Sequence, residues 1–104
     1  MKKYPVPTDI DRVDIAFGNT KYLPPKEEIP EEFWNDNHPA CQAAQQLFFK
    51  GGKLSDHGFK PKEGIDVGRA SMAIGAILAS WEPKHEHKIA GVGFLINQWF
   101  DRVE

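Results

Sequence analysis

The segment from residue 83 to residue 103 constrains the fold most, because it carries the longest helical pattern of the chain and its densest apolar load. At about 100° per residue its apolar side chains fall on one stripe, which is typical of a helix packed against a core. The stripe consists of Ile89, Val92, Ile96, Trp99, Phe100 and Val103. Pro83 suits a first helical position, where its missing N–H costs nothing. Phe94 points nearly opposite the stripe, so we expect it to face outward, toward a second layer or a partner. The pattern predicts a helix near 83–102.

Two other helices are predicted. The pattern over residues 39–50 separates an apolar face from a glutamine face and ends at Gly51-Gly52. Residues 66–81 begin at Asp66, which is a good N-cap, and continue with an apolar stripe. Residues 80–84 are few enough to fold the last two helices into an antiparallel hairpin. The motif PEEFWN, residues 30–35, predicts one helical turn before them. The predicted core consists of Leu47, Phe48, Ile74, Ile77, Leu78, Trp81, Ile89, Val92, Ile96 and Trp99.

The first 30 residues are expected to form an arm. They hold five of the eight prolines, which exclude a long helix and favour extended or turning backbone. Val13, Ile15 and Phe17 alternate with other residues ahead of Gly18-Asn19, a pattern that fits a small β-hairpin. The alternative is an extended strap that covers apolar faces of the helices.

Composition bounds the class of protein. The chain of 104 residues is long enough for one domain over residues 1–104, with the arm at 1–30 and a helical core at 31–104. No apolar run approaches the roughly 20 residues of a membrane span, and the first residues lack the apolar stretch of a signal peptide. We therefore expect a cytoplasmic protein. The predicted fold class is mainly α: a three-helix domain with a C-terminal antiparallel helical hairpin, preceded by an extended proline-rich arm or a small β-hairpin.

Some apolar positions are not needed by the core of a monomer. The side of the 66–81 helix opposite its stripe is smooth, and Phe94 adds a second outward position. An exposed apolar patch of this kind often marks an interaction site. The predicted partner-binding residues are Met72, Gly75, Ala76, Ala79 and Phe94. Two explanations stay open, a covering arm and a symmetric homodimer through the helical hairpin.

Residues 50–64 predict a long loop that supports an alternative function, nucleic-acid binding. Its lysines Lys50, Lys53, Lys60 and Lys62 would contact phosphates, and Phe59 would stack on a base. The chain has only three arginines, so a general nucleic-acid footprint is poorly supported.

A second alternative is metal binding through His85 and His87. In a helix their i,i+2 spacing would direct them about 160° apart, unlike the i,i+4 pair of a helical zinc motif. The sequence contains no nucleophile elbow, phosphate loop or Cys–His motif of recognisable spacing. We therefore expect neither enzyme activity nor a cofactor.

Several short segments carry a resemblance to a known group. AFGN at residues 16–19, IPEEF at 29–33, PKEGID at 61–66, EPKHEHK at 82–88 and WF at 99–100 occur in this order. With these segments the chain resembles small uncharacterised proteins encoded by tailed bacteriophages. The resemblance implies a context rather than an activity, and it supplies no functional residues. It leads us to expect a small non-enzymatic interaction protein that binds a host or phage protein.

Overall fold

The computed structural model describes residues 3–10, 12–18 and 20–103, and within them the protein is mainly α with a small antiparallel sheet. The helices are α1 (Arg12–Phe17), α2 (Pro39–Lys50), α3 (Val67–Ala79) and α4 (His85–Trp99). Short 3₁₀ turns occupy Thr20–Tyr22, Lys26–Glu28, Glu31–Trp34 and Leu54–His57. No helix in these residues is both long enough and apolar enough to span a membrane.

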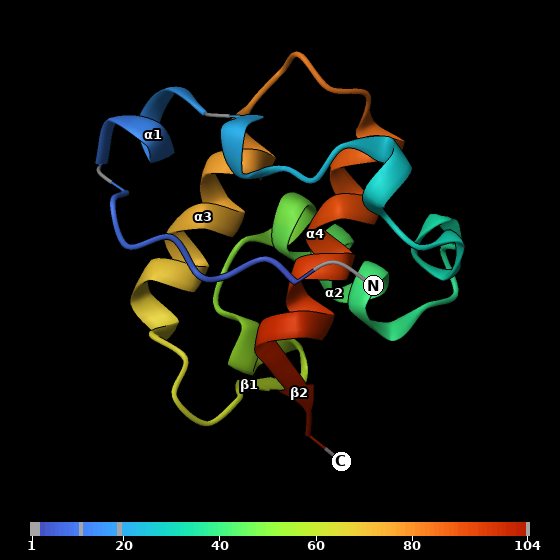
Figure 1. Cartoon of the computed structure of the whole chain (residues 1–104). Helices are drawn as coiled ribbons and strands as arrows, with labels where there is room; N and C mark the ends of the chain where they lie inside the picture. Colours follow the sequence, from blue (N-terminus) through green and yellow to red (C-terminus); the bar gives the residue numbers. More distant parts are fainter. Residues whose placement is uncertain (1–2, 11, 19, 104) are drawn as a thin grey trace.

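The three main helices agree closely with the predicted ones, and their ends are fixed by local chemistry. The bounds of α2 match the prediction, and His38 Nδ1 accepts a hydrogen bond from the Ala40 N–H at 3.1 Å. Asp66 caps α3 by accepting from the Arg69 N–H at 3.1 Å. At the other end of α3, Ser80 Oγ donates to the Ile77 carbonyl at 2.6 Å, and the helix ends at Ala79 rather than at residue 81. The chain then turns into α4, which packs against α3 as expected of a helical hairpin (Figure 1).

A two-stranded sheet replaces two predicted features. β1 (Phe59–Pro61) and β2 (Phe100–Arg102) pair antiparallel, with Lys60 opposite Asp101. The predicted loop over residues 50–64 therefore contains a 3₁₀ turn and a strand, and the predicted helix near 83–102 ends at Trp99. The pairing buries Phe59 and Phe100 on one face of the sheet, a tertiary effect that helical periodicity does not reveal. The sheet lies at the opposite end of α4 from residues 80–84 (Figure 1).

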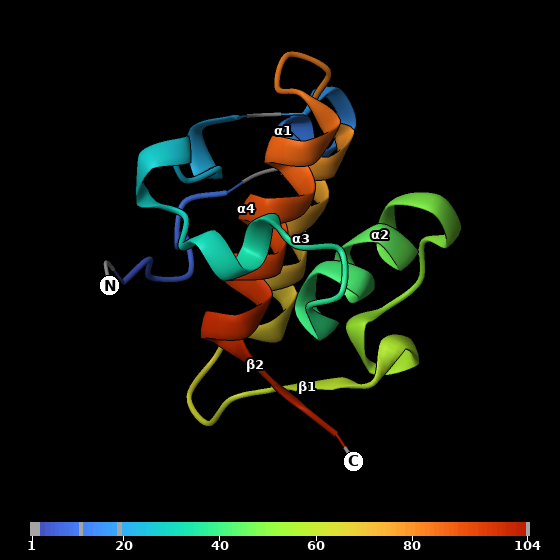
Figure 2. The same ribbon diagram turned by 90° about the vertical axis from the view of Figure 1, so that its right-hand side faces the viewer.

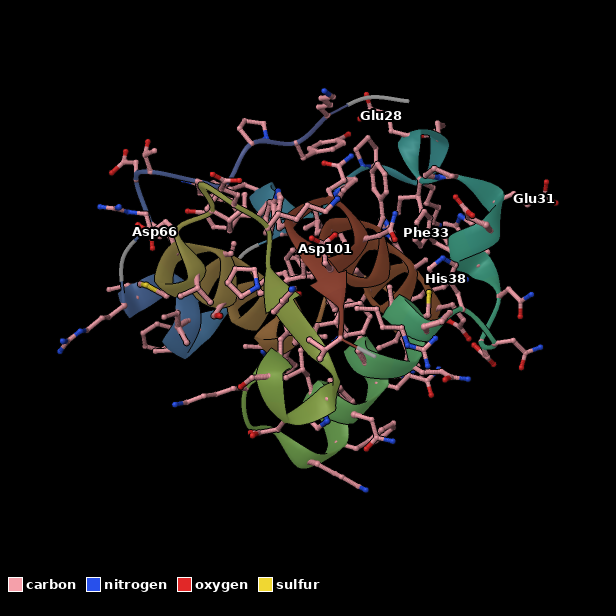
Figure 3. The ribbon with its side chains drawn as sticks, turned by 90° about the horizontal axis from the view of Figure 1, so that it is seen from below. Glu28, Glu31, Phe33, His38, Asp66 and Asp101 are labelled. Atoms are coloured by element: carbon pink, nitrogen blue, oxygen red, sulfur yellow. The ribbon has the colours of Figure 1, made fainter. Side chains whose placement is uncertain are left out.

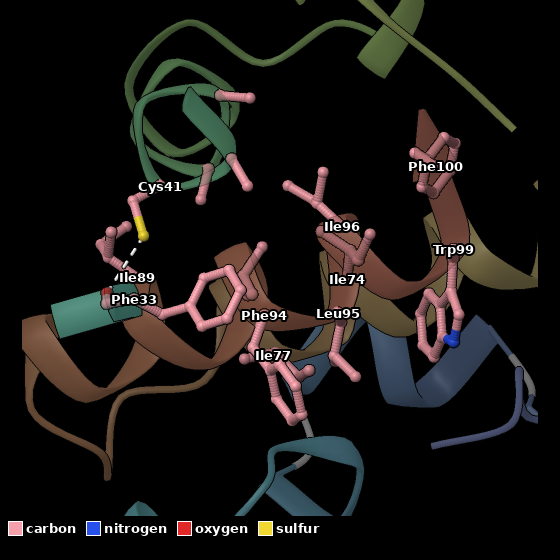
Figure 4. Packing of buried hydrophobic residues seen from close by; sticks show 14 of the residues in the cluster. Phe33, Cys41, Ile74, Ile77, Ile89, Phe94, Leu95, Ile96, Trp99 and Phe100 are labelled. Atoms are coloured by element: carbon pink, nitrogen blue, oxygen red, sulfur yellow. Dashed lines mark hydrogen bonds between the residues drawn. The ribbon is translucent and has the colours of Figure 1, made fainter. Parts of the chain in front are cut away.

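Helix α4 forms the centre of the molecule. Figure 2 shows α2 on one side of α4 and the N-terminal arm on the other. Gly93 permits the close approach of α2, because a Cβ placed there would lie 2.7 Å from Cys41 Sγ and 3.2 Å from the Cys41 backbone N. The packing around this crossing appears in Figure 4. Six of the predicted core residues are buried, as predicted: Ile74, Ile77, Ile89, Val92, Ile96 and Trp99.

The remaining core predictions differ from the structure in two directions. Trp81 is 88% exposed and Phe48 is 38% exposed, so both core assignments were wrong. Trp81 lies beyond the end of α3 and therefore leaves the stripe. Leu47 and Leu78 are half-buried. Phe94 is fully buried under a second layer, one of the two surroundings predicted for it, because Phe33 and Tyr4 cover it with ring centroids at 5.4 and 5.7 Å.

The arm is not the predicted hairpin within the residues that the structure describes. The segment expected to be its first strand forms α1, which packs against α3 and leaves Val13 and Phe17 exposed. The expected turn includes Asn19, which lies outside the described residues. Gly18 has a φ of 78° and would bring a Cβ within 2.6 Å of the Ser80 N, so a larger residue has no room. Ahead of α1 the arm follows α4, where Trp99 Nε1 donates to the Tyr4 carbonyl at 2.7 Å.

Candidate functional site

The predicted partner-binding residues do not form one surface. Ala76 and Phe94 are fully buried, so neither can contact a partner. Met72 is half-buried. Gly75 and Ala79 line one side of a groove, and a Cβ added at Gly75 would meet no atom within 4 Å. No other segment of the described part of the chain therefore approaches the backbone closely at Gly75. The arm contributes part of the covering, since α1 packs on α3, and the groove side stays open.

An exposed aromatic ridge stands beside this groove. We define the aromatic ridge as Phe48 and Phe49 at the end of α2 with His85 at the start of α4. The two phenylalanine rings meet edge to face with centroids 5.0 Å apart, and His85 lies 5.2 Å from Phe48 and 5.9 Å from Phe49. Phe49 is 71% exposed. The ridge thus presents large apolar rings whose relative positions are fixed by ring contacts.

Lys88 contacts both the aromatic ridge and the end of α3. Its side chain is buried, and its ammonium group donates to the Ser80 carbonyl at 2.7 Å and more weakly to the Leu78 carbonyl at 3.5 Å. These carbonyls lie at the end of α3, where a positive charge complements the helix dipole. The same ammonium lies 5.1 Å from the centroid of the Phe48 ring, within range of a cation–π contact. Lys88 therefore connects α3, α4 and the ridge.

The apolar groove lies between the end of α2 and α3, on the Phe48 side of the ridge. It has a volume of about 400 Å³. Leu47 and Leu78 contribute half-buried apolar surface, and Lys53 is the charged residue of its wall. The lining also includes Gly51, Gly52, Leu54, Ser71, Ile74, Gly75 and Ala79. A groove with this lining can accept an apolar side chain.

The aromatic–acidic cleft lies on the Phe49 side of the ridge and has a volume of about 370 Å³. Its walls combine the rings of Phe49, Trp34 and His85 with the carboxylates of Asp36 and Glu86. Phe33, Gln45, Ile89 and Ala90 complete the lining. Figure 3 shows that the turn preceding α2 directs Phe33 inward and Glu31 away from the body of the protein.

Cys41 lies next to this cleft and is fully buried. Its thiol donates to the Phe33 carbonyl at 3.0 Å (Figure 4). Burial raises the pKa of the Cys41 thiol to about 11, and the negative charges of Asp36 and Glu32 act in the same direction. A thiol held neutral in this way is a packing residue rather than a nucleophile.

The lysines of the nucleic-acid alternative are dispersed. Phe59 is buried, so its predicted role as a stacking platform was wrong. Lys62 Nζ donates to the Asn97 carbonyl at 3.1 Å, and Lys60 is paired across the sheet with the acidic Asp101. Lys50 ends α2, and Lys53 begins the turn after it. Lys50 and Lys53 thus lie at the end of α2, whereas Lys60 and Lys62 lie in and beside the sheet.

The two histidines of the metal alternative have separate contacts. His87 Nε2 lies 2.9 Å from the Pro24 carbonyl and its ring stacks on Trp34, whereas His85 belongs to the ridge. His85 is exposed and His87 is half-buried. Among the described residues, no three histidine, cysteine or acidic side chains gather as a possible metal site.

Comparison of the chain with models of protein families, with curated proteins and with solved structures finds no match. The sequence contained a signal for the ridge, since Phe49 lies on the polar side of the predicted 39–50 helix. It contained no comparable signal for the cleft, whose walls come from three separate segments.

Proposed function

We propose that this chain is a small non-enzymatic protein-binding module, encoded by a phage as its resemblance implies, that docks a host or phage protein on the aromatic ridge and the apolar groove beside it. The observation that carries this proposal is the exposure of Phe49 in a ridge whose other phenylalanine, Phe48, lines a groove of about 400 Å³. Large exposed aromatic rings beside a concave apolar surface are a common feature of protein interfaces.

The amount of exposed apolar surface supports the proposal. An aromatic side chain buries about 150–250 Å² when it is fully covered. The exposed fractions of Phe48 and Phe49 then amount to roughly 160–270 Å² of aromatic surface. Together with the apolar lining of the adjoining groove, these rings form an exposed apolar surface of the kind that often marks an interaction site. The ring contacts within the ridge also reduce the side-chain ordering that binding would otherwise require.

Two other occupants of the ridge and the groove, a second copy of this chain and a nucleic acid, are distinguished by experiment. A second copy of this chain would place the ridge of one protomer against the groove of the other, across a two-fold axis. A nucleic acid would instead depend on the lysines of residues 50–62. The first is detected by light scattering at micromolar concentration, and the second by a gel shift that weakens steeply with added salt.

A matched pair of variants tests the proposal. Phe49 and Phe17 are 71% and 77% exposed, so changing either to serine removes a similar apolar surface with little effect on the core. We expect affinity capture from host lysate to recover a protein partner with the wild type and with Phe17→Ser, and to lose it with Phe49→Ser. Equal recovery by both variants, or a partner lost only with Lys53→Gln and Lys60→Gln, would contradict the ridge as the docking surface.

A further inference from the structure

We propose that the aromatic–acidic cleft is the receptor for a positively charged side chain, arginine or lysine, of the bound partner. This inference rests on the proposed function and adds the chemistry of one contact residue. Its basis is a cavity in which aromatic faces and carboxylates converge, a combination that suits a cation on a flexible apolar stem.

The walls have the right chemistry for such a side chain. Trp34 is 40% exposed and Phe49 is 71% exposed, so both rings are accessible from solvent. Aromatic faces attract cations through the ring quadrupole, and tryptophan does so most strongly. The Trp34 ring is held by stacking on His87 with centroids 6.1 Å apart, and Phe49 is held by Phe48 and His85. The cleft volume of about 370 Å³ leaves room for the apolar stem between them.

The carboxylates supply the negative charge. Neither Asp36 nor Glu86 forms an ion pair with a cationic side chain of the described residues. Asp36 accepts one long hydrogen bond from Gln45 Nε2 at 3.4 Å, which leaves most of its acceptor capacity available. Glu86 lies in the first turn of α4, where it also offsets the positive end of the helix dipole.

The neighbouring charges favour a cation as well. Glu32 and Asp36 bring negative charge beside the cleft, and after burial both contribute to the raised pKa of the Cys41 thiol. Residues 26–38 contain five carboxylates and a single lysine. The nearest buried cation, Lys88, is engaged by the carbonyls of α3 and not by the cleft carboxylates. His85 lines the cleft and faces the ridge rings. A basic side chain of a partner would therefore enter a site of opposite charge, which favours specificity and rapid association.

The test uses the full chain and a small probe. N-acetyl-arginine methylamide is titrated against the protein, and binding is followed by NMR through the indole N–H of Trp34. The neutral comparison probe is the citrulline analogue, in which a urea group replaces the guanidinium group at nearly the same shape. We expect the citrulline analogue to bind at least fivefold more weakly than the arginine probe, and the lysine analogue to shift the same Trp34 signal.

Variants locate the charge that matters. The double change Asp36→Asn with Glu86→Gln should weaken binding of the arginine probe at least fivefold. The control, Glu63→Gln with Asp101→Asn, changes the net charge equally at exposed positions outside the cleft and should leave binding unchanged. Equal binding of the citrulline analogue, or equal weakening by both double variants, would overturn the cation receptor. In that case partner capture through Phe49 would still stand, so failure of this inference differs from failure of the proposed function.

Discussion

The crossing of α2 over α4 at Cys41 and Gly93 predicts a specific response to one added methyl group. A Cβ at residue 93 would lie 2.7 Å from Cys41 Sγ and 3.2 Å from both the Cα and the N of Cys41. The backbone atoms belong to a helix and cannot move alone, so Gly93→Ala must shift α2. Overpacking of this kind costs about 1–3 kcal/mol.

A second glycine provides the control. Gly75 is also inside a helix, but a Cβ added there would meet no atom within 4 Å. Replacing a helical glycine by alanine stabilises a protein by about 0.5–1 kcal/mol where space allows. Both variants gain this amount, so the difference between Gly75→Ala and Gly93→Ala isolates the clash at about 1–3 kcal/mol. Adding Cys41→Ala to Gly93→Ala removes the Sγ contact, and the double variant should be more stable than additivity predicts.

The assay is equilibrium unfolding in urea, followed by far-UV circular dichroism, with the slope of each transition compared to confirm that the same surface is exposed. We expect Gly93→Ala to be less stable than the wild type, by up to about 2.5 kcal/mol, after the helix gain is subtracted from the clash. Gly75→Ala should be more stable than the wild type. If the two alanine variants were equally stable, the close approach of α2 to α4 at Gly93 would be refuted.

Three more changes test the packing. Lys88→Met leaves buried carbonyls at the end of α3 without a donor and should cost about 1–3 kcal/mol, whereas Lys84→Met, at an exposed position, should stay within about 0.5 kcal/mol in the same urea assay. Trp99→Ala should cost about 3–5 kcal/mol and Trp81→Ala about 0.5 kcal/mol or less, and similar losses for both would contradict the assigned core. The Cys41 pKa is raised from 9.0 to about 11, so the folded state holds the thiol proton more tightly than the unfolded state does. The resulting contribution to the free energy of unfolding, roughly 2–3 kcal/mol, is present below pH 9 and is lost as pH rises toward 11. In urea unfolding at several pH values between 8 and 11, Cys41→Ala should lack this loss of stability. If the variant and the wild type lost the same stability with rising pH, the assigned role of the Cys41 thiol would be contradicted.

Helical periodicity was sufficient to predict the positions of the main helices. The bounds of α2 follow from the proline at its start and the two glycines at its end, both local signals. The predicted ends of α3 and α4 were less accurate than those of α2, because these ends depend on tertiary contacts. Ser80 stops α3 through its own hydroxyl, and β2 takes the last residues of the predicted final helix into a pairing with a distant strand.

The exposure of single residues was harder to predict than the helices. Phe94 lies opposite the apolar stripe, yet a turn and the N-terminal arm cover it, so α4 is buried on every side from residue 88 to residue 96. A helical wheel of one helix does not contain the segments that pack on it. The arm was mispredicted for a similar reason. The alternation of apolar residues over 13–17 fits a strand as well as it fits the short helix that packs on α3, and only the tertiary packing decides between them.

The candidate site was predictable only in part. Phe49 was visible in the sequence as an apolar residue outside the predicted core, and it is the more exposed of the two ridge phenylalanines. The buried ammonium of Lys88 was not predictable, because its partners are backbone carbonyls of another helix. The cleft also depends on three segments that only the fold brings together.

Photo-crosslinking in the host cell tests the central claim, docking on the aromatic ridge, most directly. A photoreactive phenylalanine analogue replaces Phe49 in one protein and Phe17, which is similarly exposed, in the other. Irradiation of cells that produce each protein is followed by mass spectrometry of the adducts. The account predicts one discrete protein adduct from position 49 and no enrichment of that adduct from position 17. Adducts of equal yield at the two positions, or no protein adduct at position 49, would contradict it.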